Sequence, residues 1–563
     1  MRPLRLALLT ATLALACAPP GPERGTRPET PRAAPRGGMV AEGTPDSVNI
    51  ALARAREDAK PQFTWATWSQ ESFERARREG RFILLDGAAS WCHWCHVMDE
   101  TTYLDPEIGR ILRDRFVAIR FDVDEHPDLA ERYIDWGWPA TILLTPDARE
   151  IGKYRGYLPP DEMRSILQEI DRAAAALEPE KKAVQPADRP ASLEALGWVA
   201  GRVNLDMDRY WDGQEGGWGR PQKVPLGANV QVELRRGARG DAGALKRAVY
   251  ALEQQRALID PVWGGIYQYS VGGTWKDPHF EKLMYYQASN LEAYARAYAA
   301  TKNEALLADA RKIAGYLNTF LSNAEGAFLV SQDADVGGHD RRERFVDGHV
   351  YYKMGDAERR VHGIPRVDDS VYGHENGLAI AAMCALYEAT RDAAVLARAR
   401  KAADLLMKTH VLPDGGVRRP TREGGERKVR FLADHAALGY GLARLAAVMG
   451  TGDAAMAGYR EAAGRIAAAM DRDLGDPETG AWFATTPDPA AAGVFSRRER
   501  THAHNVLGAR LHAALHRLTG DEALRDRGRR TLAGISSARA LRDQGRMVGE
   551  YLLALDELGI QPW

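Results

Sequence analysis

Residues 91–96 read Trp-Cys-His-Trp-Cys-His, and an apolar run at 82–85, Phe-Ile-Leu-Leu, precedes them. The apolar run predicts a buried strand, and residues 97–113 have the amphipathic spacing of a helix. A Cys-x-x-Cys at this junction places its first thiol at a helix N-terminus, where free backbone N–H groups and the helix dipole favour the thiolate. The motif therefore predicts that Cys92 is an exposed nucleophile of low pKa and that Cys95 is its resolving partner in thiol–disulfide exchange.

The segments around the motif follow the strand–helix–strand–proline–strand order of a thioredoxin fold. Residues 116–123 read as a second strand, and Pro139 leads into a third at 142–144. Pro139 resembles the cis-proline that packs beside the dithiol in thioredoxins. Asp86, at the end of the first strand, is expected to relay a proton to or from Cys95. A Cys-x-x-Cys beside such a pattern favours a thioredoxin-like redox domain.

The same motif also fits two alternatives that need a metal. The order Cys-x-x-Cys-His is the attachment pattern of covalent haem c, but haem would need a distal ligand and an apolar pocket. Zinc needs four ligands, and the cysteines and histidines of one strand–helix corner cannot all converge on it. We therefore expect a redox-active Cys92–Cys95 disulfide, no metal and no other cofactor.

Composition indicates a soluble globular protein with two or three domains. The chain has 563 residues, of which 45% are hydrophobic and 27% charged, and its formal net charge is −1. It has no basic stripe with interleaved aromatic residues, so no nucleic-acid partner is expected.

The first residues predict export and attachment to a membrane. Residues 1–17 have a basic start, an apolar run at 6–15 and a cysteine, Cys17, and so resemble a bacterial lipoprotein signal peptide. Cys17 would then carry the lipid, and the Pro-, Gly- and Ala-rich residues 18–60 would form a disordered tether. The predicted location is the bacterial cell envelope, with the chain lipid-anchored and exposed to the periplasm or the exterior. The alternative is a soluble secreted protein with an ordinary signal peptide.

Three further segments complete the predicted domain organisation. We expect a thioredoxin-like α/β domain at 61–177, a linker at 178–191 and an all-α domain at 192–563. The last segment predicts about twelve helices, with a recurring connector that supplies an Asn or Asp N-cap, namely Asn303, Asp392, Asp453 and Asp521. Six such hairpins predict a closed (α/α)6 toroid, and an open α-solenoid is the alternative.

The long loops of this helical domain carry acidic, histidine and aromatic side chains. Paired acids or a histidine base beside aromatic rings are what sugar chemistry uses. The alternative is that these residues cap helices and tie loops together. The candidate sugar-site residues are His279, Glu281, Asp333, Asp335, His374, Glu375, Trp218, Tyr267 and Trp275.

The motif at 91–98, taken with Pro-His-Phe-Glu-Lys at 278–282, resembles the family of spermatogenesis-associated protein 20, whose thioredoxin part is known as domain of unknown function 255. The resemblance implies a thioredoxin-like domain followed by a six-hairpin, glycosidase-like (α/α)6 domain. Two departures stand out. The loop at 133–137 is shorter than in the family, and Tyr286 stands where the family commonly has Asp.

Three functions remain open at this point. The leading hypothesis is a membrane-tethered thiol–disulfide oxidoreductase whose toroid binds or modifies a saccharide or a glycosylated partner. It would exchange disulfides with a partner protein. The second is a sugar epimerase or glycoside hydrolase with a regulatory dithiol. The third is a non-enzymatic, redox-sensing scaffold that binds carbohydrate or protein.

Overall fold

The computed structural model describes residues 60–173, 188–339, 343–422, 425–450 and 452–563. The predicted signal peptide, Cys17, the tether up to residue 59 and most of the linker lie outside these residues. Within them, no helix combines the length and the apolar character that crossing a membrane requires. The described residues from 60 onward belong to a single compact unit, in which the two predicted domains pack against each other.

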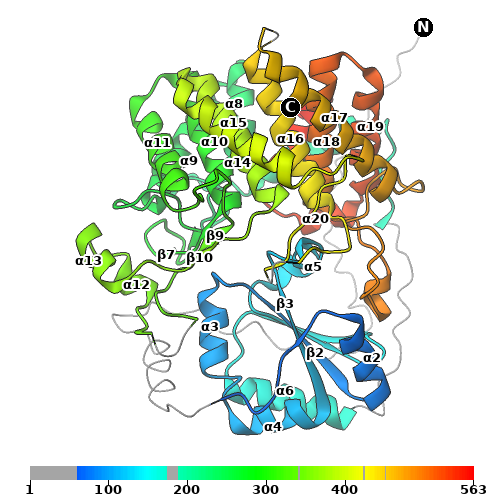
Figure 1. The fold of residues 1–563 in the computed structure, drawn as a ribbon. Helices are drawn as coiled ribbons and strands as arrows, with labels where there is room; N and C mark the ends of the chain where they lie inside the picture. The colour runs from blue at the N-terminus through cyan, green and yellow to red at the C-terminus, as the bar shows by residue number, and fades with distance from the viewer. Residues whose placement is uncertain (1–59, 174–187, 340–342, 423–424, 451) are drawn as a thin grey trace, which may run out of the picture. The chain divides into compact units, whose positions relative to one another are not determined.

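The thioredoxin-like domain is built on a five-stranded mixed sheet (Figure 1). The order is β1-β3-β2-β4-β5, with β1, β3 and β2 parallel and β4 and β5 antiparallel to their neighbours. The strands are β1 (Ala66–Thr67), β2 (Phe82–Ala88), β3 (Phe116–Asp122), β4 (Ala140–Leu144) and β5 (Glu150–Arg155).

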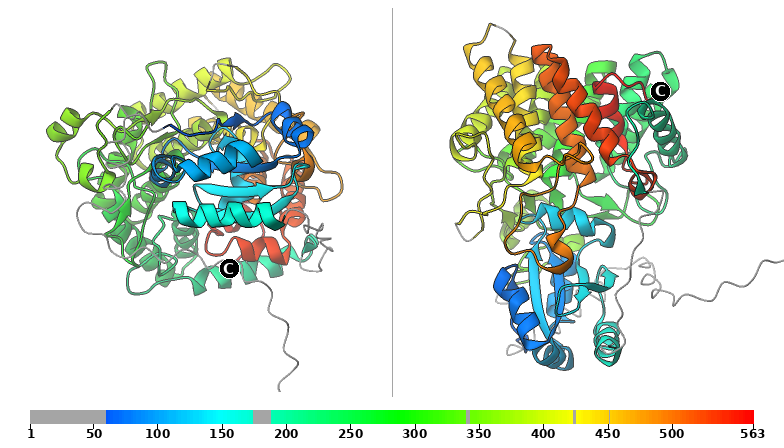
Figure 2. Two further views of the ribbon diagram at one scale, coloured as in Figure 1. Left: turned by 90° about the horizontal axis from the view of Figure 1, so that it is seen from below. Right: turned by 90° about the vertical axis from the view of Figure 1, so that its right-hand side faces the viewer.

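Side-chain alternation along β2 explains how the sheet is covered on both faces. Phe82 and Leu84 pack with residues of α3, α4 and α6, whereas Ile83 and Leu85 pack on the other face with α2. Figure 2 shows α4 and α6 lying together over one side of the sheet. The helices are α2 (Gln70–Glu79), α3 (His93–Glu100), α4 (Pro106–Arg115), α5 (Pro127–Tyr133) and α6 (Pro160–Ala173).

The single helix expected at 97–113 is in fact two helices, α3 and α4. Pro106 disfavours helical geometry in the residue before it. Asp105 instead takes an extended conformation and caps α4 by accepting hydrogen bonds from the backbone N–H groups of Glu107 and Ile108. Because of this break, α3 can extend from the motif while α4 takes a different direction and packs on the sheet.

A loop of the helical domain completes the thioredoxin core. Phe495, on a short 3-10 helix (Gly493–Ser496), lies with its ring centroid 4.9 Å from that of Trp68 and 5.9 Å from that of Phe73. The backbone N–H of Val494 donates to the carbonyl of Ala148 at 3.0 Å. The apolar core beside α2 therefore contains residues of both domains.

The helical domain is a closed ring of helical hairpins. The inner helices contact one another in chain order, and the last one, α21, returns to contact the first, α8. This closure confirms the (α/α)6 toroid and excludes the open solenoid. The inner helices are α8 (Gly227–Ala238), α10 (Met284–Thr301), α14 (Gly373–Thr390), α16 (Leu432–Met449), α18 (His502–Thr519) and α21 (Gly549–Glu557). The outer ones are α7 (Leu196–Arg209), α9 (Ala242–Gln255), α11 (Glu304–Thr319), α15 (Ala393–Thr409), α17 (Ala454–Leu474) and α19 (Glu522–Ile535).

Local signals set most of these helix boundaries. Each of the four connector residues accepts a hydrogen bond from the backbone N–H two positions later, which confirms the predicted N-caps. The sequence prediction missed the short helices α12 (Gly348–Tyr351), α13 (Asp356–His362) and α20 (Ala538–Asp543). It also missed the two-residue strands of the inter-helix loops, β6 (Tyr269–Ser270), β7 (Pro278–His279), β8 (Lys282–Leu283), β9 (Ser331–Gln332) and β10 (Val367–Asp368).

The inner helices are held together by close packing and by ion pairs. An added Cβ at Gly377 of α14 would lie 2.1 Å from the carbonyl oxygen of Ala437 on α16, so the two helices cross at a glycine. Further round the ring, the six inner helices contribute side chains to two ion-pair clusters, which the Tyr440 hydroxyl joins by accepting hydrogen bonds from Arg444 and Arg510. One cluster consists of Arg235, Arg510, Glu550 and Glu557, and the other of Glu292, Arg296, Glu388 and Arg444.

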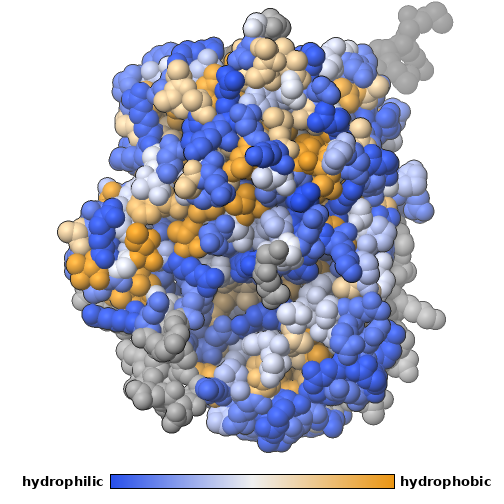
Figure 3. Space-filling view, in the orientation of Figure 1, coloured by the Kyte–Doolittle hydropathy of each residue, from blue (hydrophilic) through white to orange (hydrophobic). Residues whose placement is uncertain are grey.

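Hydrophobic and hydrophilic residues are mixed over the face shown in Figure 3, and one of its hydrophobic patches lies over α12 and α13, at the left. Val350, Val361 and Ile364 are exposed there.

Candidate functional site

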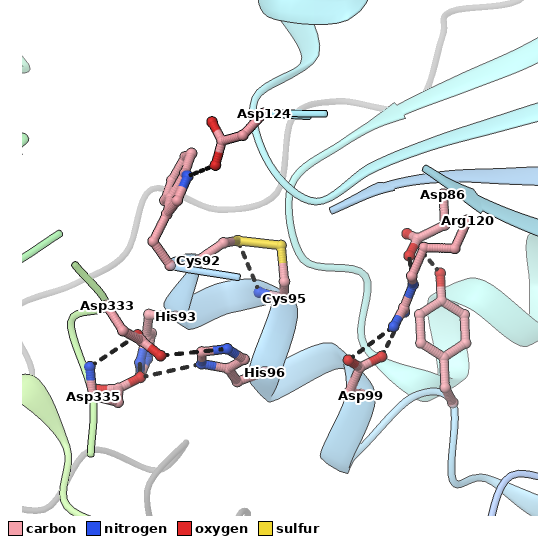
Figure 4. The surroundings of a disulfide bond; sticks show 12 residues. Asp86, Cys92, His93, Cys95, His96, Asp99, Arg120, Asp124, Asp333 and Asp335 are labelled. Carbon is pink, nitrogen blue, oxygen red and sulfur yellow. Dashed lines mark hydrogen bonds and ion pairs between the residues drawn. A yellow bond between two sulfur atoms is a disulfide. The ribbon is translucent and has the colours of Figure 1, made fainter. Parts of the chain in front are cut away.

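The two motif cysteines form a disulfide at the start of α3 (Figure 4). Their Cα atoms are 5.2 Å apart, within the usual range for a disulfide. Cys92 caps the helix, because its Sγ accepts a hydrogen bond of 3.1 Å from the backbone N–H of Cys95. A thiolate at Cys92 would keep this hydrogen bond and would lie at the positive end of the helix dipole.

The disulfide is covered rather than exposed, which corrects the expectation of an exposed nucleophile. Cys92 is 3% exposed and Cys95 is 4% exposed. Both pack in the apolar cluster that includes Trp91 and borders on Leu283 of the helical domain. The sequence did not reveal the cover because it comes from segments that lie far along the chain.

His93 is held by an acid from the helical domain. Its Nδ1 lies 2.6 Å from Oδ2 of Asp335, and both side chains are largely buried. Burial alone would lower the pKa of His93, but the Asp335 carboxylate outweighs it and raises that pKa to about 10. Asp335 is buried too, yet the charge of His93 holds its pKa well below the usual range. The pair is therefore an imidazolium–carboxylate ion pair.

His96 faces two acids without hydrogen-bonding to either. Its Nε2 lies 3.7 Å from Oδ2 of Asp333, and its Nδ1 lies 3.7 Å from Oδ2 of Asp335. Both ring nitrogens are buried and lack a hydrogen-bond partner in the described structure. The same Oδ2 of Asp333 is hydrogen-bonded at 2.9 Å to Nε2 of His339. Figure 4 shows His93 and His96 pointing from α3 toward the two acids.

Glu281 and His279 lie close enough to this cluster to be affected by its charges. Burial raises the pKa of Glu281 to about 7, and the charges of Asp335 and Asp333 add to the effect. Burial lowers the pKa of His279 to about 3, with a further contribution from His93. Four predicted sugar-site residues are thus brought to one place, and what they surround is the histidine pair of the dithiol motif.

The three predicted aromatic platforms are packed into the core of the helical domain. Trp218 and Trp275 are buried, and the Trp275 Nε1–H donates to the carbonyl of Glu215 at 2.8 Å. Tyr267 is buried against Phe280, with ring centroids 4.9 Å apart. Other side chains occupy the space around these rings, so in this conformation they offer no free stacking surface. Their assignment to a sugar stays a prediction.

His374 and Glu375 form a separate pair at the start of α14. Nδ1 of His374 lies 2.8 Å from Oε1 of Glu375. The backbone N–H of His374 donates to Asp434 of α16, which is also paired with Arg419 at 2.6 Å. The pair is tied into the start of two inner helices, as the capping alternative predicted for such residues.

Asp86 lies within β2, and Pro139 directly precedes β4. Asp86 is fully buried, its Oδ2 is 2.7 Å from Nε of Arg120, and it accepts a hydrogen bond from the Tyr103 hydroxyl. Burial raises the pKa of Asp86 in spite of Arg120. Within the described residues no hydrogen bond joins Asp86 to Cys95, so the proton relay stays a prediction. The peptide bond between Trp138 and Pro139 is cis.

Ion pairs on the other side of the motif bind the two domains together. Arg422 lies 2.7 Å from Asp122, and Arg427 lies 2.9 Å from Glu125. The Trp91 Nε1–H donates at 2.8 Å to Asp124, in the same segment. The loop after β3 is therefore clamped between the motif and the helical domain.

Several residues of this site were absent from the sequence prediction, namely Asp124, His339, Asp347, His349, Arg419 and Arg422. His349 accompanies Asp347 in a local pair, with Nδ1 3.2 Å from Oδ1. The several His and Asp residues between 333 and 349 were the only sequence signal for these positions. That signal could be interpreted only after the structure placed the motif histidines beside them.

Residues 53–189 match the protein-family model described as "Protein of unknown function, DUF255". This match confirms the resemblance predicted from the motifs. The chain is 28% identical over 324 residues to spermatogenesis-associated protein 20 of Homo sapiens, covering 51% of this chain and 41% of that protein. It is 27% identical to the uncharacterized protein B0495.5 of Caenorhabditis elegans, covering 52% of this chain and 44% of that one. The matches thus span less than half the length of these relatives.

Three further proteins are similar to parts of the chain. A stretch of 84 residues is 31% identical to thiol:disulfide interchange protein DsbD of Pseudomonas fluorescens, covering 14% of each chain. Among solved structures, a D-mannose isomerase is similar with a TM-score of 0.48 at 13% identity, covering 65% of this chain and 96% of the other. Cellobiose 2-epimerase from Bacillus thermoamylovorans is similar with a TM-score of 0.46 at 13% identity, covering 60% and 86%.

Proposed function

We propose that this chain is a thiol–disulfide oxidoreductase of the bacterial cell envelope, lipid-tethered through Cys17, with a toroid that binds or modifies a saccharide or a glycosylated partner. The observation that carries the redox activity is the Cys92–Cys95 disulfide at the N-terminus of α3, with the Cys95 N–H donated to the Cys92 sulfur. The similarity of a short stretch to thiol:disulfide interchange proteins supports the same reaction.

The proposed reaction is a two-electron exchange with a disulfide of a partner protein. In the reduced chain, the Cys92 thiolate attacks one sulfur of the partner disulfide, forms a mixed disulfide and releases a partner thiolate. The Cys95 thiolate then attacks the Cys92 sulfur, which closes the Cys92–Cys95 bond and releases the second partner thiolate. The partner gains two electrons, and the reverse sequence oxidises it.

The test is to trap the mixed disulfide in the full chain. Cys95→Ser lacks the resolving thiol and should accumulate a mixed disulfide at Cys92 with a small disulfide such as oxidised glutathione, whereas Cys92→Ser should not. Cys384→Ser is the matched control, because Cys384 is a buried thiol of α14 whose pKa burial raises to about 12. The wild type should also show one two-electron transition in glutathione buffers, within about −320 to −120 mV. A dithiol that never cycles would refute the proposal.

A second candidate places the chemistry in the toroid, as a sugar epimerase or glycoside hydrolase. The observation in its favour is Glu281, a buried carboxyl group whose Oε2 has no hydrogen-bond partner in the described structure. Glu281→Gln should then abolish turnover in a panel of mono- and disaccharides while leaving the dithiol transition unchanged. If the wild type neither binds nor converts any sugar of the panel, the toroid has no carbohydrate role of this kind.

The anchor is tested independently of both activities. A bacterium that expresses the full chain and is fed radiolabelled palmitate should label the wild-type protein, and Cys17→Ala should remove the label and shift the protein from the membrane fraction to the soluble fraction. Equal labelling of both forms would leave secretion without a lipid as the surviving alternative.

A further inference from the structure

We infer that His96, His339 and Asp333 form a binding site for one divalent transition-metal ion beside the disulfide. The ligand atoms would be Nε2 of each histidine and one carboxylate oxygen, and single donor atoms of the three residues lie within 4.8 Å of one another. Nε2 of His96 is 3.7 Å from Oδ2 of Asp333, and Nε2 of His339 is 2.9 Å from the same oxygen. Metal–ligand bonds of about 2.0–2.2 Å fit among donors spaced in this way.

His96 supplies an independent reason for an ion at this place. The residue is 5% exposed, and neither ring nitrogen has a hydrogen-bond partner in the described structure. Its separation of 3.7 Å from each carboxylate is too long for a hydrogen bond. Leaving a buried imidazole unpaired is unfavourable, whereas a metal ion between Nε2 and Asp333 satisfies the nitrogen and the carboxylate together.

On the opposite side of the imidazole a carboxylate lies 3.7 Å away, in the place where metal-bound histidines usually have a hydrogen-bonded one. Nδ1 of His96 faces Oδ2 of Asp335, whose Oδ1 accepts a hydrogen bond of 2.8 Å from the backbone N–H of Gly348. A shift that brought Nδ1 within hydrogen-bond distance of this carboxylate would fix the tautomer that presents Nε2 to a metal. Gly338 keeps the loop against the ring, since an added Cβ there would lie 2.7 Å from Nδ1.

The donor set indicates the class of metal. Two imidazoles and one carboxylate suit zinc, iron or a similar ion, whereas calcium and magnesium prefer oxygen ligands alone. Three protein ligands leave a position for water or another ligand, and the His339 side chain is 25% exposed, so this position can open to solvent. The neighbouring group of His93, Asp335 and Asp347 is not included, because neither ring nitrogen of His93 is a buried atom without a hydrogen-bond partner, as both of His96 are.

The sequence prediction of no metal considered only the four side chains of the dithiol motif. In the structure, one motif histidine meets ligands from the loop after β9, and neither cysteine is needed. The inference is independent of the proposed redox activity, and its test measures metal content.

The experiment uses the untagged full chain with Zn²⁺ as the probe. The protein is stripped with EDTA, incubated with Zn²⁺ and passed through gel filtration, and zinc is counted by mass spectrometry. We expect about one zinc ion per chain for the wild type. His339→Ala and Asp333→Asn should each lose most of it while keeping the circular dichroism spectrum of the wild type. His362→Ala, which changes a histidine of α13 outside the cluster, should bind like the wild type.

A double variant, Cys92→Ser with Cys95→Ser, separates this site from a zinc ion held by the reduced dithiol. The double variant should keep its zinc, and its Co²⁺ form should lack thiolate-to-metal charge transfer. Zinc that persists in both His339→Ala and Asp333→Asn, zinc lost only with the cysteines, or no zinc in the wild type would each overturn the inference.

Discussion

Nδ1 of His93 lies 2.6 Å from Oδ2 of Asp335, although the two residues are 242 positions apart in the chain. The contact joins the dithiol motif to the long connection between α11 and α14 of the toroid. The same loop carries Asp333 against His96. Because both motif histidines face acids of the helical domain, the environment of the disulfide is formed by residues of both domains.

Breaking this pair should cost stability. Asp335→Asn leaves His93 buried without its counter-charge, and loss of one partner of a buried ion pair typically costs about 3–5 kcal/mol. Urea unfolding of the full chain measures the change, and a cycle with His93→Gln isolates the coupling of the two residues. His349→Gln, at a histidine whose side chain is 42% exposed, is the control and should cost less than about 1 kcal/mol. Equal losses for Asp335→Asn and the control would contradict the ion pair.

The covered disulfide should become more reactive when the clamp on the β3 loop is released. Arg422→Ala removes the ion pair with Asp122. A loss of about 1.4 kcal/mol in domain docking would raise the alkylation rate of reduced Cys92 about tenfold. Timed iodoacetamide labelling and peptide mass spectrometry measure the rate. Arg465→Ala on α17, which removes an exposed pair with Glu461, should label like the wild type. If both variants match the wild type, the clamp does not control access.

Asp86 tests the predicted relay. Asp86→Asn should leave the first alkylation of Cys92 unchanged and slow the second step of exchange, because the proton acceptor for Cys95 is lost. The mixed disulfide with glutathione would then accumulate in the variant during single-turnover experiments. Resolution as fast as in the wild type would show that Asp86 serves only its ion pair with Arg120.

Acid should weaken the ring network through Glu292. Burial favours the neutral carboxyl group, but Arg296, Arg444 and Arg510 outweigh it and lower the pKa from 4.5 to about 2. A depressed folded-state pKa gives stability that is complete above pH 4.5 and is lost as pH falls toward 2. The difference corresponds to about 3 kcal/mol. The difference in free energy of unfolding between the wild type and Glu292→Gln should therefore shrink by about this amount between pH 5 and pH 2. A constant gap would contradict the assignment.

The glycine crossing of α14 and α16 should tolerate no side chain. Gly377→Ala places a methyl group against the Ala437 carbonyl and should destabilise the fold by about 1–3 kcal/mol or more. Gly464→Ala is the matched control, because an added Cβ there meets nothing within 4 Å in α17 and should stabilise the helix by up to about 1 kcal/mol. Thermal unfolding distinguishes the two, and equal effects would refute the close crossing.

The sequence predicted most helix positions because the deciding signals are local. The N-caps at Asn303, Asp392, Asp453 and Asp521 could be predicted in this way, since each of these residues caps a helix that begins at the next position. The break between α3 and α4 also has a local sequence signal, Asp105-Pro106, which the prediction overlooked.

The site could be predicted only in part, because its residues meet through tertiary contacts. The sequence identified Asp333, Asp335 and Glu281 as candidates from their loop positions and chemistry. It could not place them against His93 and His96, since no periodicity or cap relates a motif near residue 95 to a loop near residue 335. Burial of Trp218, Tyr267 and Trp275 likewise depends on packing that a single sequence does not display.

Phe495 has a consequence for work on isolated fragments. The ring lies among Trp68, Phe73 and Tyr133, so a peptide that ends near residue 190 would leave these three rings without their partner. Such a fragment would expose apolar surface and would tend to self-associate. The end of the matched family segment is therefore not the end of a part that folds on its own. Redox measurements on a fragment cut there would not report the environment that the dithiol has in the full chain.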